Sequence, residues 1–126
     1  MTRSRKLEPL DEDWLDEPSN SLSFKRLPSS QEDERLSATL VKIDGKHQEL
    51  RTDASSRLYL ILEGEFEFFI RVGERTPSEN DAKKTIHARS GDCVLIEKGE
   101  WYSFAARGRY IVINGPAFAP GDDQYS

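Results

Sequence analysis

Few residues of this 126-residue chain could carry out catalysis by their own chemistry. The sequence has two histidines, His47 and His87, and one cysteine, Cys93. Histidine ordinarily titrates near neutral pH, so it is the usual general acid or base. We expect both histidines to be ordinary strand or surface residues. We expect Cys93 to be an inert thiol, buried with the apolar residues Val94–Ile96 that follow it.

Arginine and aspartate side chains lie close together in the middle of the chain. Arg51 and Arg57 flank Asp53, and Tyr59 follows Arg57 by two positions. Side chains alternate between the two faces of a strand, so Arg51 would share a face with Asp53, and Arg57 with Tyr59. A guanidinium suits carboxylates and phosphates because its planar fork donates two parallel hydrogen bonds. The pattern is typical of an anion site or, alternatively, of a buried ion-pair cluster.

Composition limits the partners and the compartment. The net charge of −5 argues against nucleic acid, because phosphate contacts need a basic face. A single cysteine allows no internal disulfide and is typical of a reducing compartment. No apolar run approaches the roughly 18 residues of a membrane span. We therefore expect a cytoplasmic protein that binds neither nucleic acid nor membrane.

Short apolar segments separated by turn signals predict strands from Ser21 onward. Alternating or continuous apolar residues occur at Leu36–Ile43, Arg57–Leu62 and Glu65–Arg71, and no long helical pattern is present. Eight to ten short strands of this kind predict an all-β sandwich or barrel. Residues 1–20 are acidic and interrupted by prolines, so we expect a short, partly flexible N-terminal arm before a domain at residues 21–126.

Four glycines follow the apolar segments at positions where tight turns are expected: Gly45, Gly64, Gly91 and Gly99. Their spacing resembles that of the two motifs of the cupin family, over about residues 42–118. The resemblance implies a double-stranded β-helix, that is, a cupin-like jelly-roll barrel. A cyclic-nucleotide-binding domain is a weaker match, because its phosphate-binding Gly-Glu…Arg-x-Ala cassette does not follow Ile96.

The resemblance also implies which residues face the barrel interior. Metal-binding cupins hold the ion with two histidines and a glutamate from the first motif and a histidine from the second. Arg51, Asp53, Arg57 and Tyr102 stand at those positions, and two guanidiniums would repel a cation. We therefore expect no metal and no cofactor. The expected ligand-binding residues are Arg51, Asp53, Arg57, Tyr59, Tyr102 and Phe104.

Two functions remain open at this point. The first is a metal-independent small-molecule-binding or dimerisation module, with a carboxylate or sugar phosphate as the anionic ligand. We expect this protein to be a homodimer, because Phe66, Phe68 and Phe69 occupy both faces of one strand and at least one of them needs cover from outside its own sheet. The second is a metal-free sugar isomerase or epimerase, as in the cupin-like epimerases. Tyr102 could then be the acid, its pKa lowered by the arginines. The lack of a histidine at an expected cavity position argues against the enzyme.

Overall fold

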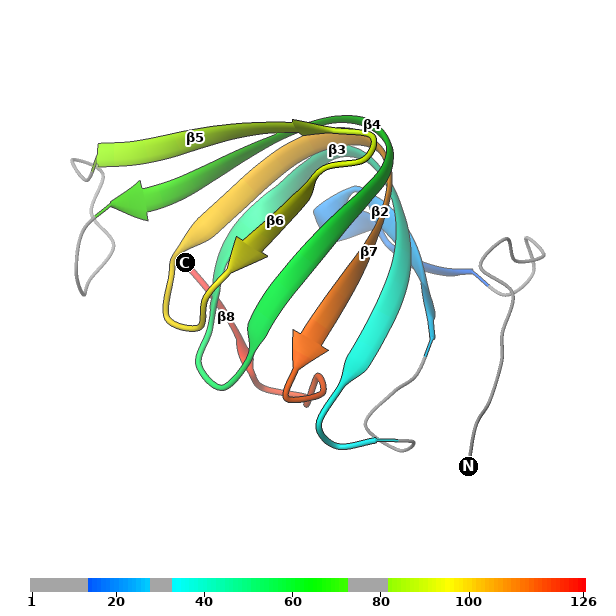
Figure 1. Cartoon of the computed structure of the whole chain (residues 1–126), viewed down its shortest axis with the longest axis vertical. Helices are drawn as coiled ribbons and strands as arrows, with labels where there is room; N and C mark the ends of the chain where they lie inside the picture. The colour runs from blue at the N-terminus through cyan, green and yellow to red at the C-terminus, as the bar shows by residue number, and fades with distance from the viewer. Residues whose placement is uncertain (1–13, 28–32, 73–81) are drawn as a thin grey trace.

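The computed structural model describes residues 14–27, 33–72 and 82–126. These residues form eight strands and one short 3-10 helix (Figure 1). The elements are β1 (Leu15–Glu17), η2 (Pro18–Asn20), β2 (Leu22–Arg26), β3 (Ser37–Thr52), β4 (Ser56–Val72), β5 (Ala82–Arg89), β6 (Cys93–Ile96), β7 (Tyr102–Gly115) and β8 (Asp123–Tyr125). Within the described ranges, no helix is long and apolar enough to cross a membrane.

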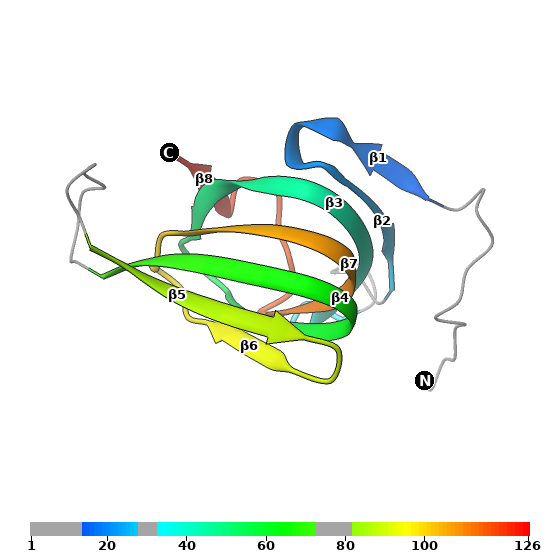
Figure 2. The ribbon, with the colours of Figure 1, turned by 90° about the horizontal axis from the view of Figure 1, so that it is seen from above.

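The strands form one antiparallel sheet that curves around a single interior. The order is β1-β2-β3-β7-β4-β5, with β6 also paired to β4 and β8 to β3. Figure 2 shows the long strands β3, β7 and β4 bending around the interior, with β1 and β2 at one side and β5 and β6 at the other. The all-β barrel predicted from the sequence is confirmed.

The glycines do not all serve as the sequence predicts. Gly91 and Gly99 lie in turns, as expected. The turns predicted at Gly45 and Gly64 are wrong, because β3 and β4 continue through both residues. Gly64 lies opposite Gly108 of β7 in the sheet, and a Cβ atom at Gly64 would lie 1.9 Å from a backbone oxygen of β7. These glycines let two bent strands approach closely.

An irregularity in β4 keeps both halves of this long strand packed on the core. The register with β7 shifts between Ile61 and Glu63. A bulge of this kind reverses which residues face inward. Tyr59 and Ile61 are therefore buried before the shift, and Phe66 is buried after it.

The interior is rich in aromatic residues. Tyr59 contacts four other rings edge-on or tilted, with centroid separations of 5.2–6.1 Å. These partners are Phe68, Tyr102, Phe104 and Tyr110. Such pairs add to the stabilisation that comes from burying the rings themselves. These packed rings lie beneath the polar groups described below.

A second apolar cluster covers part of the outer surface of the sheet. It contains Leu27, Leu40 and Ile111, and Trp14 packs against it. The N-terminal arm predicted for residues 1–20 is described only from Trp14 onward, and its last residues join the sheet as β1. Residues 1–13 lie outside the described part of the chain.

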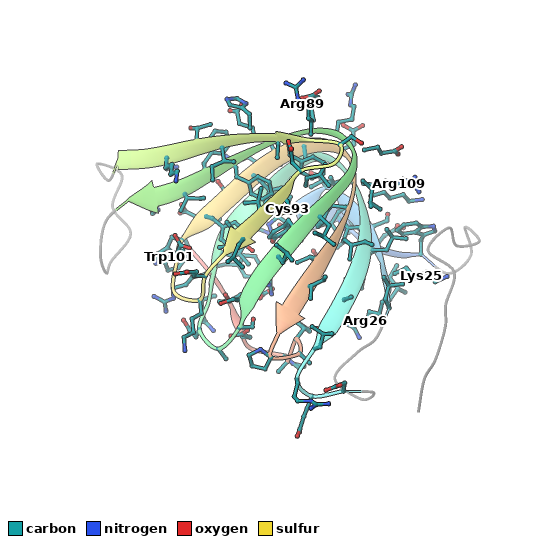
Figure 3. All side chains as sticks on the ribbon, viewed as in Figure 1. Lys25, Arg26, Arg89, Cys93, Trp101 and Arg109 are labelled. Carbon is teal, nitrogen blue, oxygen red and sulfur yellow. The ribbon has the colours of Figure 1, made fainter. Side chains whose placement is uncertain are left out.

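The single cysteine is not placed as expected. Cys93 is exposed on β6, whereas Val94 and Ile96 of the same strand are buried (Figure 3). The prediction of a buried thiol is wrong, because β6 buries only one of its two faces.

Candidate functional site

A pocket of about 130 Å³ opens between the sheet and the C-terminal segment. Its polar lining includes Glu17, His47, Arg57, Tyr59, Asn114 and Asp123, and its apolar walls include Phe24, Val41 and Val112. A wider hollow of about 440 Å³ lies along β1, β2 and β3. Because buried titratable groups gather in the smaller pocket, we take it as the candidate functional site.

His47 of β3 is buried in the pocket wall. Its imidazole stacks on the ring of Phe104, with centroids 4.8 Å apart. Its Nδ1 lies 2.9 Å from the backbone oxygen of Gln48. A carbonyl oxygen only accepts hydrogen bonds, so Nδ1 carries the proton and Nε2 of the neutral ring is an acceptor.

Burial lowers the pKa of His47 from its ordinary value of 6.5, because the charged imidazole loses solvation. The Gln48 carbonyl and the carboxylates of Glu17 and Asp123 act in the opposite direction, whereas Arg57 adds to the lowering. His47 is therefore neutral at physiological pH. A neutral histidine with a free Nε2 has the form of a general base.

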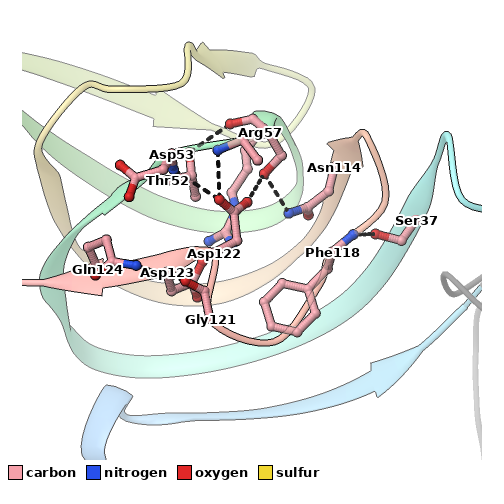
Figure 4. A network of polar contacts seen from close by, with 12 residues as sticks. Ser37, Thr52, Asp53, Arg57, Asn114, Phe118, Gly121, Asp122, Asp123 and Gln124 are labelled. Atoms are coloured by element: carbon pink, nitrogen blue, oxygen red, sulfur yellow. Dashed lines mark hydrogen bonds and ion pairs between the residues drawn. The ribbon is translucent and has the colours of Figure 1, made fainter.

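Arg57 of β4 forms an ion pair with Asp123 of β8 (Figure 4). The two side chains are 9% and 20% exposed. Burial raises the pKa of Asp123 above its ordinary value, although the guanidinium opposes this shift. The Nε of Arg57 is buried and has no hydrogen-bond partner in the described part of the molecule. Such a donor is one that a ligand or an ordered water would satisfy.

Two tyrosine hydroxyls meet beneath the pocket. The Oη atoms of Tyr59 and Tyr102 are 2.6 Å apart, and both side chains are almost fully buried. Burial raises the pKa of each tyrosine. Arg57 acts to lower the pKa of Tyr102, as expected, but burial outweighs it, so the net lowering that an acid role needs is not present. Both hydroxyls stay protonated and able to donate a hydrogen bond.

No family model and no curated protein matches the chain. Similar solved structures include a variant of Streptomyces PAC13 with uridine, at a TM-score of 0.76 and 16% identity over 100% of this chain and 92% of that chain. KdgF from Halomonas matches with a TM-score of 0.68 and 17% identity, over 86% and 92% of the two chains. Oxalate decarboxylase from Bacillus subtilis matches with a TM-score of 0.71 and 13% identity, over 90% and 30%. The fold is that of a cupin barrel.

The cupin barrel places the predicted site residues in two separate groups. Arg57, Tyr59, Tyr102 and Phe104 are buried in the interior. Arg51 instead lies outside, where its Nε is 2.8 Å from Asp53 Oδ1 and its guanidinium stacks over Trp101. Of the expected lining residues, Arg57 and Tyr59 line the pocket, whereas Tyr102 and Phe104 are buried beneath it. The expected lining is wrong for Arg51 and Asp53, and Arg57 pairs with Asp123 in place of Asp53.

A β-bulge explains this difference. The register between β3 and β7 shifts between His47 and Leu50. His47 faces inward before the shift, and Leu50 and Thr52 face inward after it. Arg51, between these last two, must therefore face outward.

Sequence reasoning missed two groups of pocket residues. His47 was expected to be an ordinary strand or surface residue, yet it lines the pocket. Glu17, Phe118, Asp123 and Tyr125 come from the two ends of the described chain and reach the pocket by long-range contacts. Nothing in the local sequence around them indicates that placement. Plain alternation from the buried Val41 and Ile43 already places His47 on the inward face, and only the outward placement of Arg51 requires knowledge of the bulge.

The side chains of the pocket are a poor fit for a metal ion. Among residues 14–27, 33–72 and 82–126, no three histidine, cysteine or acidic side chains are grouped so that they could hold an ion. The guanidinium of Arg57 also lies where a cation would be repelled. Independence from metal stays a prediction of the sequence.

The lowered pKa of His47 predicts how stability depends on pH. A folded-state pKa below the unfolded value of 6.5 means that the stabilising contribution is complete above pH 6.5 and is lost as pH falls. We expect the free energy of unfolding to fall by up to about 1.4 kcal/mol per pH unit in this range because of His47. Urea unfolding at pH 7.5, 6.5 and 5.5 would measure it for the wild type and for His47→Gln.

His87→Gln is the matched control for this pH dependence. The side chain of His87 is 72% exposed on β5, so His87→Gln removes a histidine without changing the pocket. Asp123 acts in the opposite direction, because its raised pKa favours the folded state at low pH. Only the difference between wild type and His47→Gln is therefore diagnostic. Parallel pH profiles for the two proteins would contradict the placement of His47.

Proposed function

We propose that this cupin barrel is a metal-independent protein that binds a small polar or anionic molecule and carries out general acid–base chemistry on it. The observation that carries the proposal is His47, a buried neutral imidazole with its Nδ1 bonded to a backbone carbonyl, beside a guanidinium and a tyrosine pair. The reaction class is proton abstraction followed by isomerisation or by loss of a leaving group.

His47 is assigned the role of base. The Gln48 carbonyl fixes the tautomer, so that Nε2 is the atom that accepts the substrate proton. Stacking on Phe104 restricts the rotation of the ring. Once His47 is protonated, the carboxylates of Glu17 and Asp123 stabilise the imidazolium.

Arg57 and Tyr59 are assigned to substrate binding and to the developing negative charge. The Nε of Arg57 has a proton to donate, and its charge favours a carboxylate, a phosphate or an enolate oxygen. Tyr59 can donate its hydroxyl proton toward the pocket while it accepts one from Tyr102. The ligand-binding role of Arg57, Tyr59, Tyr102 and Phe104 is part of this proposal.

The solved relatives suggest which substrates to try first. PAC13 is called a unique nucleoside dehydratase, and three of its variants were solved with uridine. At 14–16% identity this likeness supports the fold alone, so nucleosides enter only as test compounds for this chain. Sugar phosphates and carboxylates are also test compounds, because the guanidinium of Arg57 suits anionic groups.

A binding or dimerisation module is the second candidate. The Arg57–Asp123 pair could serve only to fill the polar interior, as a buried ion-pair cluster would. Leu62 and Leu95 are exposed on β4 and β6, which favours pairing of two copies of the chain. We also propose that the protein forms a homodimer, that it is soluble and cytoplasmic, and that it binds no nucleic acid.

A thermal-shift screen tests the proposal. The panel contains uridine and other nucleosides, sugar phosphates and small carboxylates. A ligand at about 100 times its Kd adds about 2.7 kcal/mol to the folded state, which raises the Tm by several degrees. We expect at least one compound to stabilise the wild type and to lose that effect in Arg57→Met.

Arg107→Met is the control for the screen, because Arg107 is 84% exposed and pairs with Asp44 at the surface. It should respond to ligands as the wild type does. If no compound stabilises the wild type, or if Arg57→Met responds equally, the binding pocket is refuted and the scaffold alternative is supported.

A further inference from the structure

The C-terminal segment forms one wall of the pocket. Phe118, Asp123 and Tyr125 all line it, although the strand that ends the segment, β8, has only three residues. β8 pairs with the end of β3 through Leu50, Arg51 and Thr52. So short a strand at a sheet edge needs further contacts to hold a fixed position.

Asp122 supplies those contacts. Its Oδ1 accepts hydrogen bonds from the backbone N–H groups of Asp53 and Ala54, at 2.9 and 2.7 Å. Its Oδ2 accepts a hydrogen bond from Ser55 Oγ at 2.6 Å. Figure 4 shows this carboxylate facing the loop between β3 and β4, beside Arg57 and Asp123. Three donors on one buried carboxylate make a strong, directional anchor.

The anchor is charged at neutral pH. Burial acts to raise the pKa of Asp122, but the hydrogen bonds from Ser55, Ala54 and Asp53 outweigh it and lower the pKa. Hydrogen bonds to a charged group contribute more to stability than hydrogen bonds between neutral groups. Asp122 therefore binds the loop more firmly than the three-residue strand alone would.

We propose that Asp122 is a positioning residue of the pocket, fixing the C-terminal segment so that Asp123 faces Arg57 and His47. Asp122 lies directly before Asp123, so holding its carboxylate on the loop sets the place at which the next side chain enters the pocket. The role rests on the proposed function of the pocket. The contact itself exists without substrate.

The pKa of His47 measures whether Asp123 is in place. The charged groups that act on His47 are Glu17 from β1, Arg57 from β4 and Asp123 from β8. Asp123 raises the pKa of His47, so loss of its position should lower that pKa further. Histidine NMR titration of the ligand-free protein reports this shift. Asp123→Asn provides the reference for complete loss of the charge.

We expect Asp122→Ala to lower the pKa of His47 in the direction set by Asp123→Asn. Amide exchange at Asp53 and Ala54 should accelerate at least about tenfold, the equivalent of one charge-assisted hydrogen bond. Asp122→Asn should leave both the pKa of His47 and the amide exchange near their wild-type values. The side-chain oxygen of the asparagine can accept hydrogen bonds from the two amides, and its NH₂ can donate one to Ser55.

Gln124→Ala is the matched control. Gln124 lies in β8, and its side chain donates its hydrogen bond to Gly121 within the same segment, so loss of that side chain should move neither readout. If Asp122→Ala accelerates exchange but leaves the pKa of His47 at the wild-type value, Asp122 only stabilises the loop and the proposal is overturned.

Ser55→Ala removes one of the three hydrogen bonds and serves if Asp122→Ala does not fold. A smaller fall in the pKa of His47 then supports the proposal, and an unchanged value overturns it. Neither readout needs a substrate. A failed ligand screen would therefore refute the function proposed for the pocket without touching this result.

Discussion

His47→Gln should reduce turnover of any substrate of this pocket by about 10²–10⁴-fold, the range that general acid–base groups contribute. Glutamine is similar in size and can keep a hydrogen bond to the Gln48 carbonyl, but it cannot accept a substrate proton at neutral pH. Ligand affinity should stay within a few-fold of the wild type, because Arg57 and Tyr59 remain. Steady-state kinetics and calorimetric binding would be measured on the same protein.

His87→Gln controls for the loss of a histidine as such, since His87 lies exposed on β5, where it faces Glu67. Its kinetic constants should match those of the wild type. If His47→Gln keeps full turnover of a ligand that binds the pocket, His47 is not the base.

Asp123→Ala should lower the free energy of unfolding by about 3–5 kcal/mol, as removal of one partner of a buried ion pair does. The variant leaves the guanidinium of Arg57 buried and without its carboxylate. Arginine cannot release its proton to escape that cost. Urea unfolding at pH 7 would measure the loss.

Replacing Arg57 and keeping Asp123 should lower the free energy of unfolding by less. In Arg57→Met the carboxyl of Asp123 can take up a proton, and burial already raises its pKa. The double variant Arg57→Met/Asp123→Leu removes both charges and should approach or exceed wild-type stability. Equal losses for Asp123→Ala and Arg57→Met would contradict this asymmetry and the burial of the pair.

The glycine spacing and apolar segments were sufficient to predict the cupin-type barrel. Turns at Gly91 and Gly99 follow directly from the sequence. Gly45 and Gly64 carry the same signal, but they lie within long strands. A Cβ atom at Gly64 would meet the backbone of β7, and one at Gly45 would meet the side chain of Ser21. A glycine indicates a backbone conformation that other residues rarely adopt. Such a conformation occurs both in tight turns and in sharply bent strands, so the glycine alone does not distinguish them.

The site was predicted only in part. Strand alternation grouped Arg57 with Tyr59 correctly, because no irregularity separates them. The bulge between His47 and Leu50 reverses the faces of β3 after His47, so Leu50 and Thr52 face the interior and Arg51 does not. Asp123 pairs with Arg57 in the pocket, although the two residues are 66 positions apart in the sequence. Local patterns carry no record of such pairings.

The proposed function requires His47 to accept a proton from the substrate bound in the pocket. The most direct measurement is proton NMR in D₂O of each compound that stabilises the protein, incubated with wild type and with His47→Gln. We expect the wild type to exchange a carbon-bound proton for deuterium, or to eliminate a leaving group, in at least one compound, and His47→Gln to bind that compound unchanged. Bound compounds that stay unaltered with the wild type, or that react equally with both proteins, would contradict the claim.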